Sequence, residues 1–453
     1  MKKIGTVAVL IGFLIMACSK MELEEPLDVM VGGTTTVFAE FSNAFQIPAP
    51  NLNADGLQEH RQADAAFEAI FVTAPAEINA GVGPLFNQNS CAACHSKNGR
   101  AAFPEIAGDL GGLLFRVSLP GQGMHGEPLA VSGFGTQLQT KATFGKEAEA
   151  KIQITYETIE GAFADGEKYT LRRPIYNIQQ AYLPFPSNAL FSPRIAPPVF
   201  GLGLLENINE ADILKNADEY DRNNDGISGR PNYVWDVQTN KKMLGRFGWK
   251  ANQPNLHQQT AAAYSDDMGV TSPLFPTDPA KGQLQEDSFA DDPEISDALV
   301  TLTAFYTESL GVPAPRRQAD ADVKSGKLLF KNIGCTKCHS PQFTTDLNLD
   351  LPFLSNQKIQ PYTDLLLHDM GAGLADNRPD FEASGQEWRT PPLWGIGLTQ
   401  VVSGHSNFLH DGRARNLQEA ILWHDGEAKS AKESFKKLSK KEREQILYFL
   451  FAL

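Results

Sequence analysis

Apolar residues recur at helical spacing in the clearest patterns of the chain. Val323, Leu328, Leu329 and Ile333 repeat at intervals typical of an amphipathic helix, and residues 436–453 show a similar pattern. Alternation of apolar and polar residues, which marks a half-buried strand, is sparse. The pattern therefore predicts a mainly α fold with long loops.

The N-terminus carries a different pattern, an unbroken apolar run. Two lysines precede 12 largely apolar residues at positions 4–15. This run is shorter than the roughly 20 residues that span a bilayer as a helix, and it is typical of a secretory signal peptide. Cys18 follows a small residue at its end, as in a lipoprotein leader. We expect residues 1–18 to be a lipoprotein signal peptide, with the lipid on Cys18, and residues 19–40 to form a tether. A plain signal peptide with an incidental cysteine is the alternative.

Composition and charge limit the partners. No later stretch reaches about 18 consecutive apolar residues, so the lipid is the only membrane attachment that we predict. The leader predicts the bacterial periplasm or the cell surface. The length of 453 residues allows two or three domains. The net charge of −14 disfavours nucleic acid, because phosphates would be repelled, and would suit a small basic electron carrier.

Cysteine usage narrows the chemistry. Besides Cys18, the cysteines form two identical patterns, Cys91-Ala-Ala-Cys94-His95 and Cys335-Thr-Lys-Cys338-His339. Cys-x-x-Cys-His is the attachment motif of c-type haem. Two thiols three positions apart reach the two vinyl groups of one porphyrin, and the adjacent histidine faces the iron as the proximal ligand.

Three other interpretations of these cysteines compete with haem attachment. A secreted chain could pair them in two disulfides, four thiolates could bind one zinc ion, or the histidines could be chance neighbours. A histidine after both pairs is improbable by chance, and zinc sites rarely separate their halves by about 240 residues. We therefore expect two covalent haem c groups, with His95 and His339 as proximal ligands.

The two motifs imply two haem-binding halves with an internal repeat. The polar run at 312–322 is the favoured boundary, which gives an N-terminal haem domain at 41–315 and a C-terminal cytochrome c-like haem domain at 316–453. The segment RIAPPVFGLG at 194–203 resembles RTPPLWGIG at 389–397. A coincidence of turns rich in proline and glycine is the alternative.

The repeat makes the two haem sites comparable. Trp249 and His410 each precede a helix-starting leucine by seven residues. Fourteen residues after His410 stands His424, whereas fourteen after Trp249 stands Ala263. If the halves are copies, His424 lies over the distal face of the second haem, and the first haem meets only a methyl group there. The sequence thus predicts one relay haem and one reactive haem.

The chain resembles a known family along most of its length. The stretches LFNQNSCAACHSKNGR, RIAPPVFGLGLLE, LGRFGWKANQPNLHQQTAAAYSDDMG, GKLLFKNIGCTKCH and FLHDGRARNLQEAILWHDGEA are similar to the di-haem oxidoreductases, once called predicted thiol oxidoreductases, of the bacterial di-haem cytochrome c peroxidase superfamily. This resemblance implies reduction of peroxide or a related oxidant at the N-terminal haem. Electrons would pass through the C-terminal haem from a small cytochrome or another periplasmic donor.

The resemblance also implies roles for single residues. In the superfamily a tryptophan between the haems carries electrons, a glutamine follows ten residues later, and an acid follows ten further on. Trp249 and Gln259 match this spacing. Gly269 stands at the third place, but Asp267 in Asp-Met-Gly resembles the superfamily's Glu-Met-Gly and is our candidate for proton transfer. A core tryptophan, a solvated glutamine and a helix-end carboxylate are the alternatives.

Three departures from the superfamily pattern stand out. His424 occupies a place where the superfamily usually carries methionine over the C-terminal haem, and this change generally lowers the redox potential. Gly111 stands where enzymes that need reductive activation have a removable histidine. Residues at about 104–190 have no clear counterpart and form a family-specific insertion, which we expect to be a lid or a partner surface.

Asp221, Asn223 and Asp225, followed by Gly226, resemble the first half of an EF-hand loop. The glutamate at the twelfth position is missing, because Asn232 stands there. We favour a calcium ion, with a turn rich in Asx residues as the alternative.

Two other functions remain open on the sequence alone. One is an electron-transfer cytochrome without substrate, in which both irons are six-coordinate. The other is a redox accessory to iron uptake. Vacancy at the first iron would separate them from a peroxidase.

Overall fold

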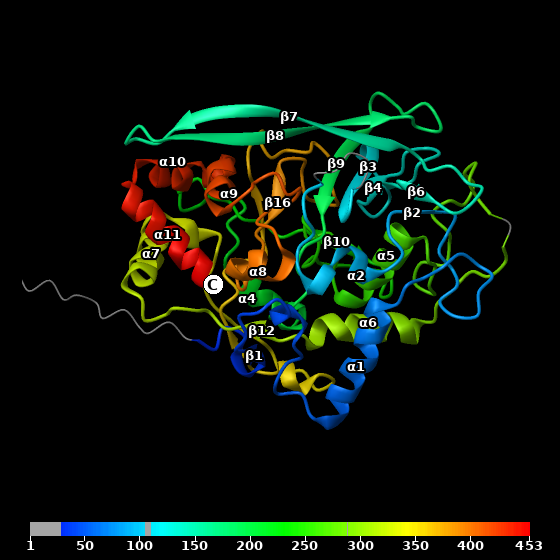
Figure 1. Ribbon diagram of the computed structural model, residues 1–453, viewed down its shortest axis with the longest axis horizontal. Coiled ribbons are helices and arrows are strands. Elements are labelled where there is room, and N and C mark those ends of the chain that lie inside the picture. Colours follow the sequence, from blue (N-terminus) through cyan, green and yellow to red (C-terminus); the bar gives the residue numbers. More distant parts are fainter. Residues whose placement is uncertain (1–28, 105–109, 288) are drawn as a thin grey trace, which may run out of the picture.

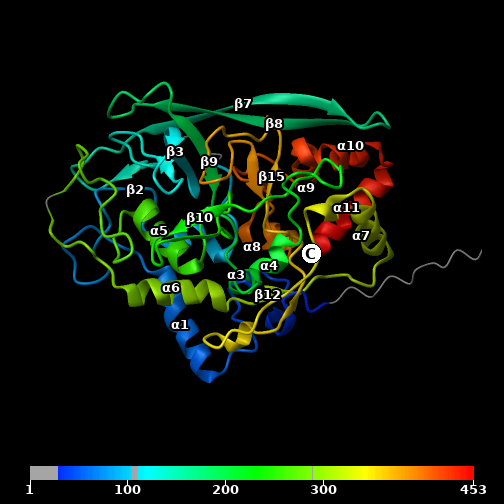
Figure 2. The same cartoon turned by 180° about the vertical axis from the view of Figure 1, so that it is seen from behind.

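The computed structural model describes residues 29–104, 110–287 and 289–453. Figure 1 shows its ribbon and Figure 2 the same ribbon from behind. The leader, Cys18 and the first part of the predicted tether lie outside the described residues. The α-helices are α1 (Ala54–Glu68), α2 (Cys91–Cys94), α3 (Leu202–Glu206), α4 (Glu210–Leu214), α5 (Leu256–Met268), α6 (Asp297–Ser309), α7 (Ala321–Asn332), α8 (Thr399–Ser403), α9 (Leu417–Trp423), α10 (Lys429–Lys437) and α11 (Lys440–Ala452).

The prediction of a mainly α fold is wrong. Helices make up 29% of the described chain and strands 20%. The strands are β1 (Thr36–Val37), β2 (Leu85–Phe86), β3 (Leu113–Gln122), β4 (Pro128–Leu129), β5 (Gln137–Leu138), β6 (Lys141–Ala142), β7 (Lys151–Ala162), β8 (Lys168–Gln179), β9 (Leu190–Ile195), β10 (Tyr233–Asp236), β11 (Lys241–Leu244), β12 (Val312–Pro313), β13 (Phe343–Thr344), β14 (Lys358–Ile359), β15 (Leu367–Asp369) and β16 (Glu387–Arg389).

Most of the longer strands lie in the insertion. One sheet has the order β4-β3-β5, with β9 also paired to β3, and β7 and β8 form a separate antiparallel hairpin. The signal for this hairpin was present in the sequence. Ile, Thr and Tyr are frequent in residues 151–162 and 168–179, and an Asp-Gly turn at Asp165 and Gly166 separates the two runs.

The insertion spans both halves of the molecule rather than standing apart as a lid. In Figures 1 and 2 the β7–β8 hairpin crosses above α9 and α10. Arg443 of α11 forms ion pairs with Asp165 and Glu167 at the hairpin turn. The hydroxyl of Tyr176 on β8 donates to Asp411 at 2.9 Å. These contacts fix the position of the C-terminal half against the insertion.

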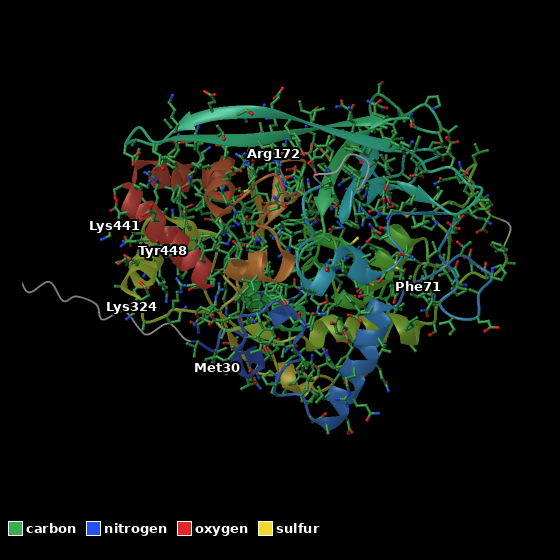
Figure 3. The ribbon with its side chains drawn as sticks, in the orientation of Figure 1. Met30, Phe71, Arg172, Lys324, Lys441 and Tyr448 are labelled. Carbon is green, nitrogen blue, oxygen red and sulfur yellow. The ribbon has the colours of Figure 1, made fainter. Side chains whose placement is uncertain are left out.

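Other contacts also join the two halves. One apolar core contains Phe115 of β3 together with Phe330 of α7 and Phe449 of α11. Lys324 and Lys441 mark the exposed sides of α7 and α11 in Figure 3.

The internal repeat is visible in three dimensions. Gly201 and Gly395 follow the two Pro-Pro turns, and both have a left-handed backbone, with φ of 70° and 68°. A Cβ on Gly201 would lie 2.7 Å from the Trp394 ring, and one on Gly395 would lie 2.6 Å from the Phe200 ring. Each turn therefore packs its aromatic residue on the glycine of the other, and only glycine allows both the backbone and the approach.

Side-chain caps mark the starts of α5, α9 and α11. α5 and α9 both begin after an asparagine, Asn255 and Asn416, whose side chain accepts from a backbone N–H of the first turn. Ser439 and Glu442 form a capping box at the start of α11, which confirms the amphipathic helix predicted there. No helix in the described ranges is long and apolar enough to cross a bilayer.

Candidate functional site

The first haem motif faces a cavity, which we call the first cavity. It is lined by Cys91, Cys94, His95, Arg116, Trp249, Gln259, Ala263 and Asp267, among others. Nδ1 of His95 lies 2.7 Å from the carbonyl oxygen of Pro197. Because this carbonyl can only accept, Nδ1 carries the proton and the lone pair is on Nε2. Burial lowers the pKa of His95 to about 4, so the ring is neutral and able to bind a metal through Nε2.

The second haem motif faces another cavity, the second cavity. Its lining includes Cys335, Cys338, His339, Trp249, Met370, His410 and His424. Nδ1 of His339 lies 2.9 Å from the carbonyl oxygen of Tyr362, and Nδ1 of His424 lies 2.7 Å from that of Ala420. Burial lowers the pKa of both histidines. His424 thus has the same neutral form and free Nε2 as the two motif histidines.

The two cavities use matching helices. Residues of α5 line the first cavity, and residues 161 positions later, in α9 and at its end, line the second. The matching residues are Leu256 and Leu417, Gln259 and Ala420, Thr260 and Ile421, and Ala263 and His424. Ala263 lines the first cavity with a methyl group, as His424 lines the second with an imidazole. His95 is the only histidine among the described lining residues of the first cavity. Met268 also lines it, but its side chain belongs to a neighbouring apolar core with Phe71 and Tyr264.

Trp249 lies between the two cavities and lines both of them. Its side chain is 8% exposed, and its indole N–H donates to the carbonyl of Ile195 at 2.8 Å. The guanidinium of Arg100 lies 5.3 Å from the ring centroid, and the backbone N–H of Arg389 donates to the Trp249 carbonyl. Arg100 and Arg389 also line both cavities. The ring is therefore held at the boundary between the two sites.

α5 places Gln259 and Asp267 on the same face. They are eight residues apart, or about two helical turns, with Ala263 midway between them. Gly269 is the left-handed residue that ends the helix, so a side chain two positions after Asp267 would not face the first cavity in the same way. Asp267 is therefore the last acidic side chain that α5 presents to the first cavity.

The carboxyl group of Asp267 has an altered proton affinity. Burial raises its pKa to about 6, although the charge of Arg116 and a hydrogen bond from Gln137 at 2.8 Å lower it. Gln259 lines the first cavity, and its carboxamide makes no hydrogen bond to another side chain or to the backbone of the described residues, so it is available to a ligand. A carboxyl with this pKa can accept and return a proton near neutral pH.

Arg116 and Gln137 were missed by the sequence reasoning, because both belong to the insertion. Arg116 of β3 lines the first cavity and forms an ion pair with Asp266 at 2.5 Å. Gln137 begins β5 and reaches the end of α5. No motif links them to Asp267, which follows about 130 residues later. The expectation that the insertion is only a lid or partner surface therefore leaves out its contribution to the site.

The loop predicted to bind calcium lies beside the second cavity. Asp221 accepts from the backbone N–H groups of Asp225 and Gly226, and Asn223 also accepts from Asp225. The carboxylate of Asp225 lies 3.0 Å from the ammonium group of Lys337 in the second haem motif. Calcium at Asp221, Asn223 and Asp225 stays a prediction.

Another polar cluster near the second cavity consists of Cys338, Asp364 and His368. Both ring nitrogens of His368 have carboxylate partners, Asp364 at 2.8 Å and Glu427 at 2.7 Å. The Asp364 carboxylate and the Cys338 sulfur raise the pKa of His368 against the effect of burial, which keeps the ring charged. A protonated ring has no lone pair for a metal, so this cluster ties the loop after His424 to the second motif instead.

The cysteine geometry narrows the alternatives considered for the two motifs. None of the four cysteines in the described chain forms a disulfide. The two pairs line different cavities, so one zinc ion cannot bind all four thiolates. Each cavity instead combines two sulfur atoms, a neutral histidine and a largely apolar wall, which is the set of groups that a c-type haem requires.

Two cavities of this composition, separated by one tryptophan, define a di-haem redox protein. The profile of the family described as "Di-haem oxidoreductase, putative peroxidase" matches residues 28–453, and the chain belongs to this family. A search of curated proteins gave no match. Haem is the cofactor that the family description names, and the residues of both cavities fit it.

Proposed function

We propose that this protein reduces hydrogen peroxide or a related small oxidant at a haem in the first cavity, with electrons supplied through a haem in the second. The main support for this proposal is the difference between the two cavities at one matching position. Ala263 presents only a methyl group to the first cavity, whereas His424 presents a neutral imidazole at the matching place of the second.

The motif residues would hold both groups. Cys91 and Cys94 would form the thioether bonds of the first haem, and His95 would be its proximal ligand. In the second cavity Cys335 and Cys338 would form these bonds. His339 and His424 would there bind the haem iron through their free Nε2 atoms. When bound, the two haems supply one-electron redox chemistry and one open coordination position.

Asp267 and Gln259 would serve the substrate. Reduction of hydrogen peroxide to two waters consumes two electrons and two protons. At neutral pH the Asp267 carboxylate, with its pKa of about 6, would take the proton from one peroxide oxygen and return it to the departing oxygen. The free carboxamide of Gln259 would hold the peroxide by hydrogen bonds. Trp249 would carry electrons, because it lines both cavities.

The setting of this activity is also part of the proposal. A lipid on Cys18 would tether the protein to a membrane of the bacterial periplasm or the cell surface, and a small cytochrome or another periplasmic carrier would supply electrons. Calcium at Asp221, Asn223 and Asp225 would stiffen the loop that contacts the second motif through Lys337.

The test is a stoichiometric titration of the fully reduced protein with hydrogen peroxide under anaerobic conditions. Two reduced haems hold two electrons, so one equivalent of peroxide should oxidise both within a single rapid reaction. Absence of any reaction would support an electron-transfer cytochrome. Slow reaction with peroxide beside rapid turnover of a ferric chelate would support a redox accessory to iron uptake.

A further inference from the structure

Two buried glutamines of the insertion reach the end of α5. Gln137 and Gln139 are 3% and 4% exposed. Both side-chain N–H groups donate to the backbone carbonyl of Asp266, at 2.8 Å and 2.6 Å. Only Gln137 also donates to the carboxylate of Asp267, at 2.8 Å. The two side chains thus make the same contact with the helix, but only Gln137 contacts the acid, whereas the carboxamide oxygen of Gln139 accepts from Asn87 at 2.6 Å.

Charges around Asp267 make this hydrogen bond important. Arg116 of β3 faces it with a positive charge, while Asp266 of the same helix faces it with a negative one. The cysteines of the first motif lie close enough on α2 for Asp267 to raise the pKa of both thiols, and Lys141 of β6 opposes this effect at Cys94. The Arg116 charge is shared with Asp266 through their ion pair. A direct N–H donor is the remaining group that favours the ionised form of Asp267.

We propose that Gln137 is the positioning residue for Asp267, holding its carboxylate in one orientation and in the ionised form toward the first cavity. This inference rests on the proposed function in one respect, that Asp267 is the group that accepts the proton. It gives the insertion a direct role in the reaction. The strand that holds Gln137 is fixed to β3, because Phe115 and Arg116 pair with Leu138 and Gln137.

The experiment compares Gln137→Met with Gln139→Met in the haem-loaded protein. Methionine keeps the length and volume of glutamine and removes the donor. Both variants lose a hydrogen bond to the Asp266 carbonyl, so a merely structural effect should appear in both. The rate of the peroxide reaction should rise with pH through the pKa of Asp267. In Gln137→Met this rise should move upward by about one pH unit, since one bond to a charged group is lost. In Gln139→Met it should stay where it is.

A second measurement does not depend on activity. Infrared difference spectra of the ferric protein, recorded during a pH titration without peroxide, report protonation of buried carboxyl groups. The band that disappears in Asp267→Asn identifies this residue. Its titration should move upward in Gln137→Met and stay in place in Gln139→Met. Gln137→Glu, which faces Asp267 with a second acid, should move it further.

The outcomes separate this inference from the proposed function. Equal shifts in both methionine variants, or no shift in either, would overturn the role of Gln137. A selective infrared shift in a protein that does not react with peroxide would uphold the contact between Gln137 and Asp267 and refute the peroxidase proposal. If Gln137→Met does not accumulate as folded protein, the comparison of Gln137→Glu with wild type decides by the same infrared band.

Discussion

The two cavities are built alike and differ on the helix that lines each of them. Each has a Cys-x-x-Cys-His motif, a histidine fixed by a backbone carbonyl, and a helix capped by asparagine. Where the first cavity has Ala263, the second has His424. Under the function proposed above, the methyl group would leave the first iron open to a ligand, whereas the imidazole would close the second.

Closing the first cavity should produce the largest effect. Ala263→His places an imidazole where His424 stands in the other half, so the peroxide reaction should be abolished and the first haem should become low-spin. Absorption spectra and rapid mixing with peroxide measure both. Ala263→Ser keeps the position small and is the control. A fully active Ala263→His would show that the distal side of the first haem is not at Ala263.

Removal of the acid comes next. Asp267→Asn keeps the size of the side chain and removes its ability to take a proton, so we expect the rate to fall roughly 10²–10⁴-fold. In wild type the rate should rise with pH through about 6, because only the ionised carboxylate accepts a proton. This rise should be absent in Asp267→Asn. Its persistence there would assign the titration to another group.

Changing the second distal ligand should have a smaller effect on rate and a clear effect on potential. His424→Met replaces imidazole by a thioether, which should raise the reduction potential of the second haem and leave it low-spin. Potentiometric titration with optical detection measures this change. Met370 also lines the second cavity, and Met370→Leu is the control with no expected shift. A shift in the control alone would make Met370 the ligand.

The smallest effects concern the caps of the matching helices. Asn416→Ala should lower the free energy of unfolding by about 1 kcal/mol through loss of one cap. Asn255→Ala should cost more, because Asn255 also donates to the carboxylate of Asp236 at 3.0 Å. Denaturant unfolding of the haem-loaded variants measures these free energies of unfolding. Equal losses would mean that the Asp236 contact adds nothing.

Local patterns in the sequence predicted the parts of the site that lie close to the motifs or follow the repeat. The motif residues and the contrast between Ala263 and His424 depend on spacing along one helix, which the chain carries explicitly. The partners of Asp267 depend on a sheet that returns from a distant segment. Gln137 is brought to α5 by strand pairing, and no short-range signal encodes that approach.

The fold prediction failed for a related reason. Helical spacing is clearest beside the second haem motif, whereas the β7–β8 hairpin is marked by two runs rich in Ile, Thr and Tyr and by an Asp-Gly turn at Asp165 and Gly166. In Figure 3 Arg172 marks this hairpin, and its guanidinium lies 4.4 Å from the ring centroid of Phe103. The placement of the hairpin over the C-terminal half depends on long-range contacts, such as the ion pairs of Arg443 with Asp165 and Glu167, which composition cannot reveal.

Electron paramagnetic resonance of the haem-loaded protein tests directly whether the first iron is open to a substrate while the second is closed. The spectra should be recorded for the fully oxidised protein and after one-electron reduction. We expect a high-spin first haem in at least one of these states, and a second haem that is low-spin, with two imidazole ligands, in both. Two low-spin haems in both states would contradict it, because no iron would then be open to a substrate.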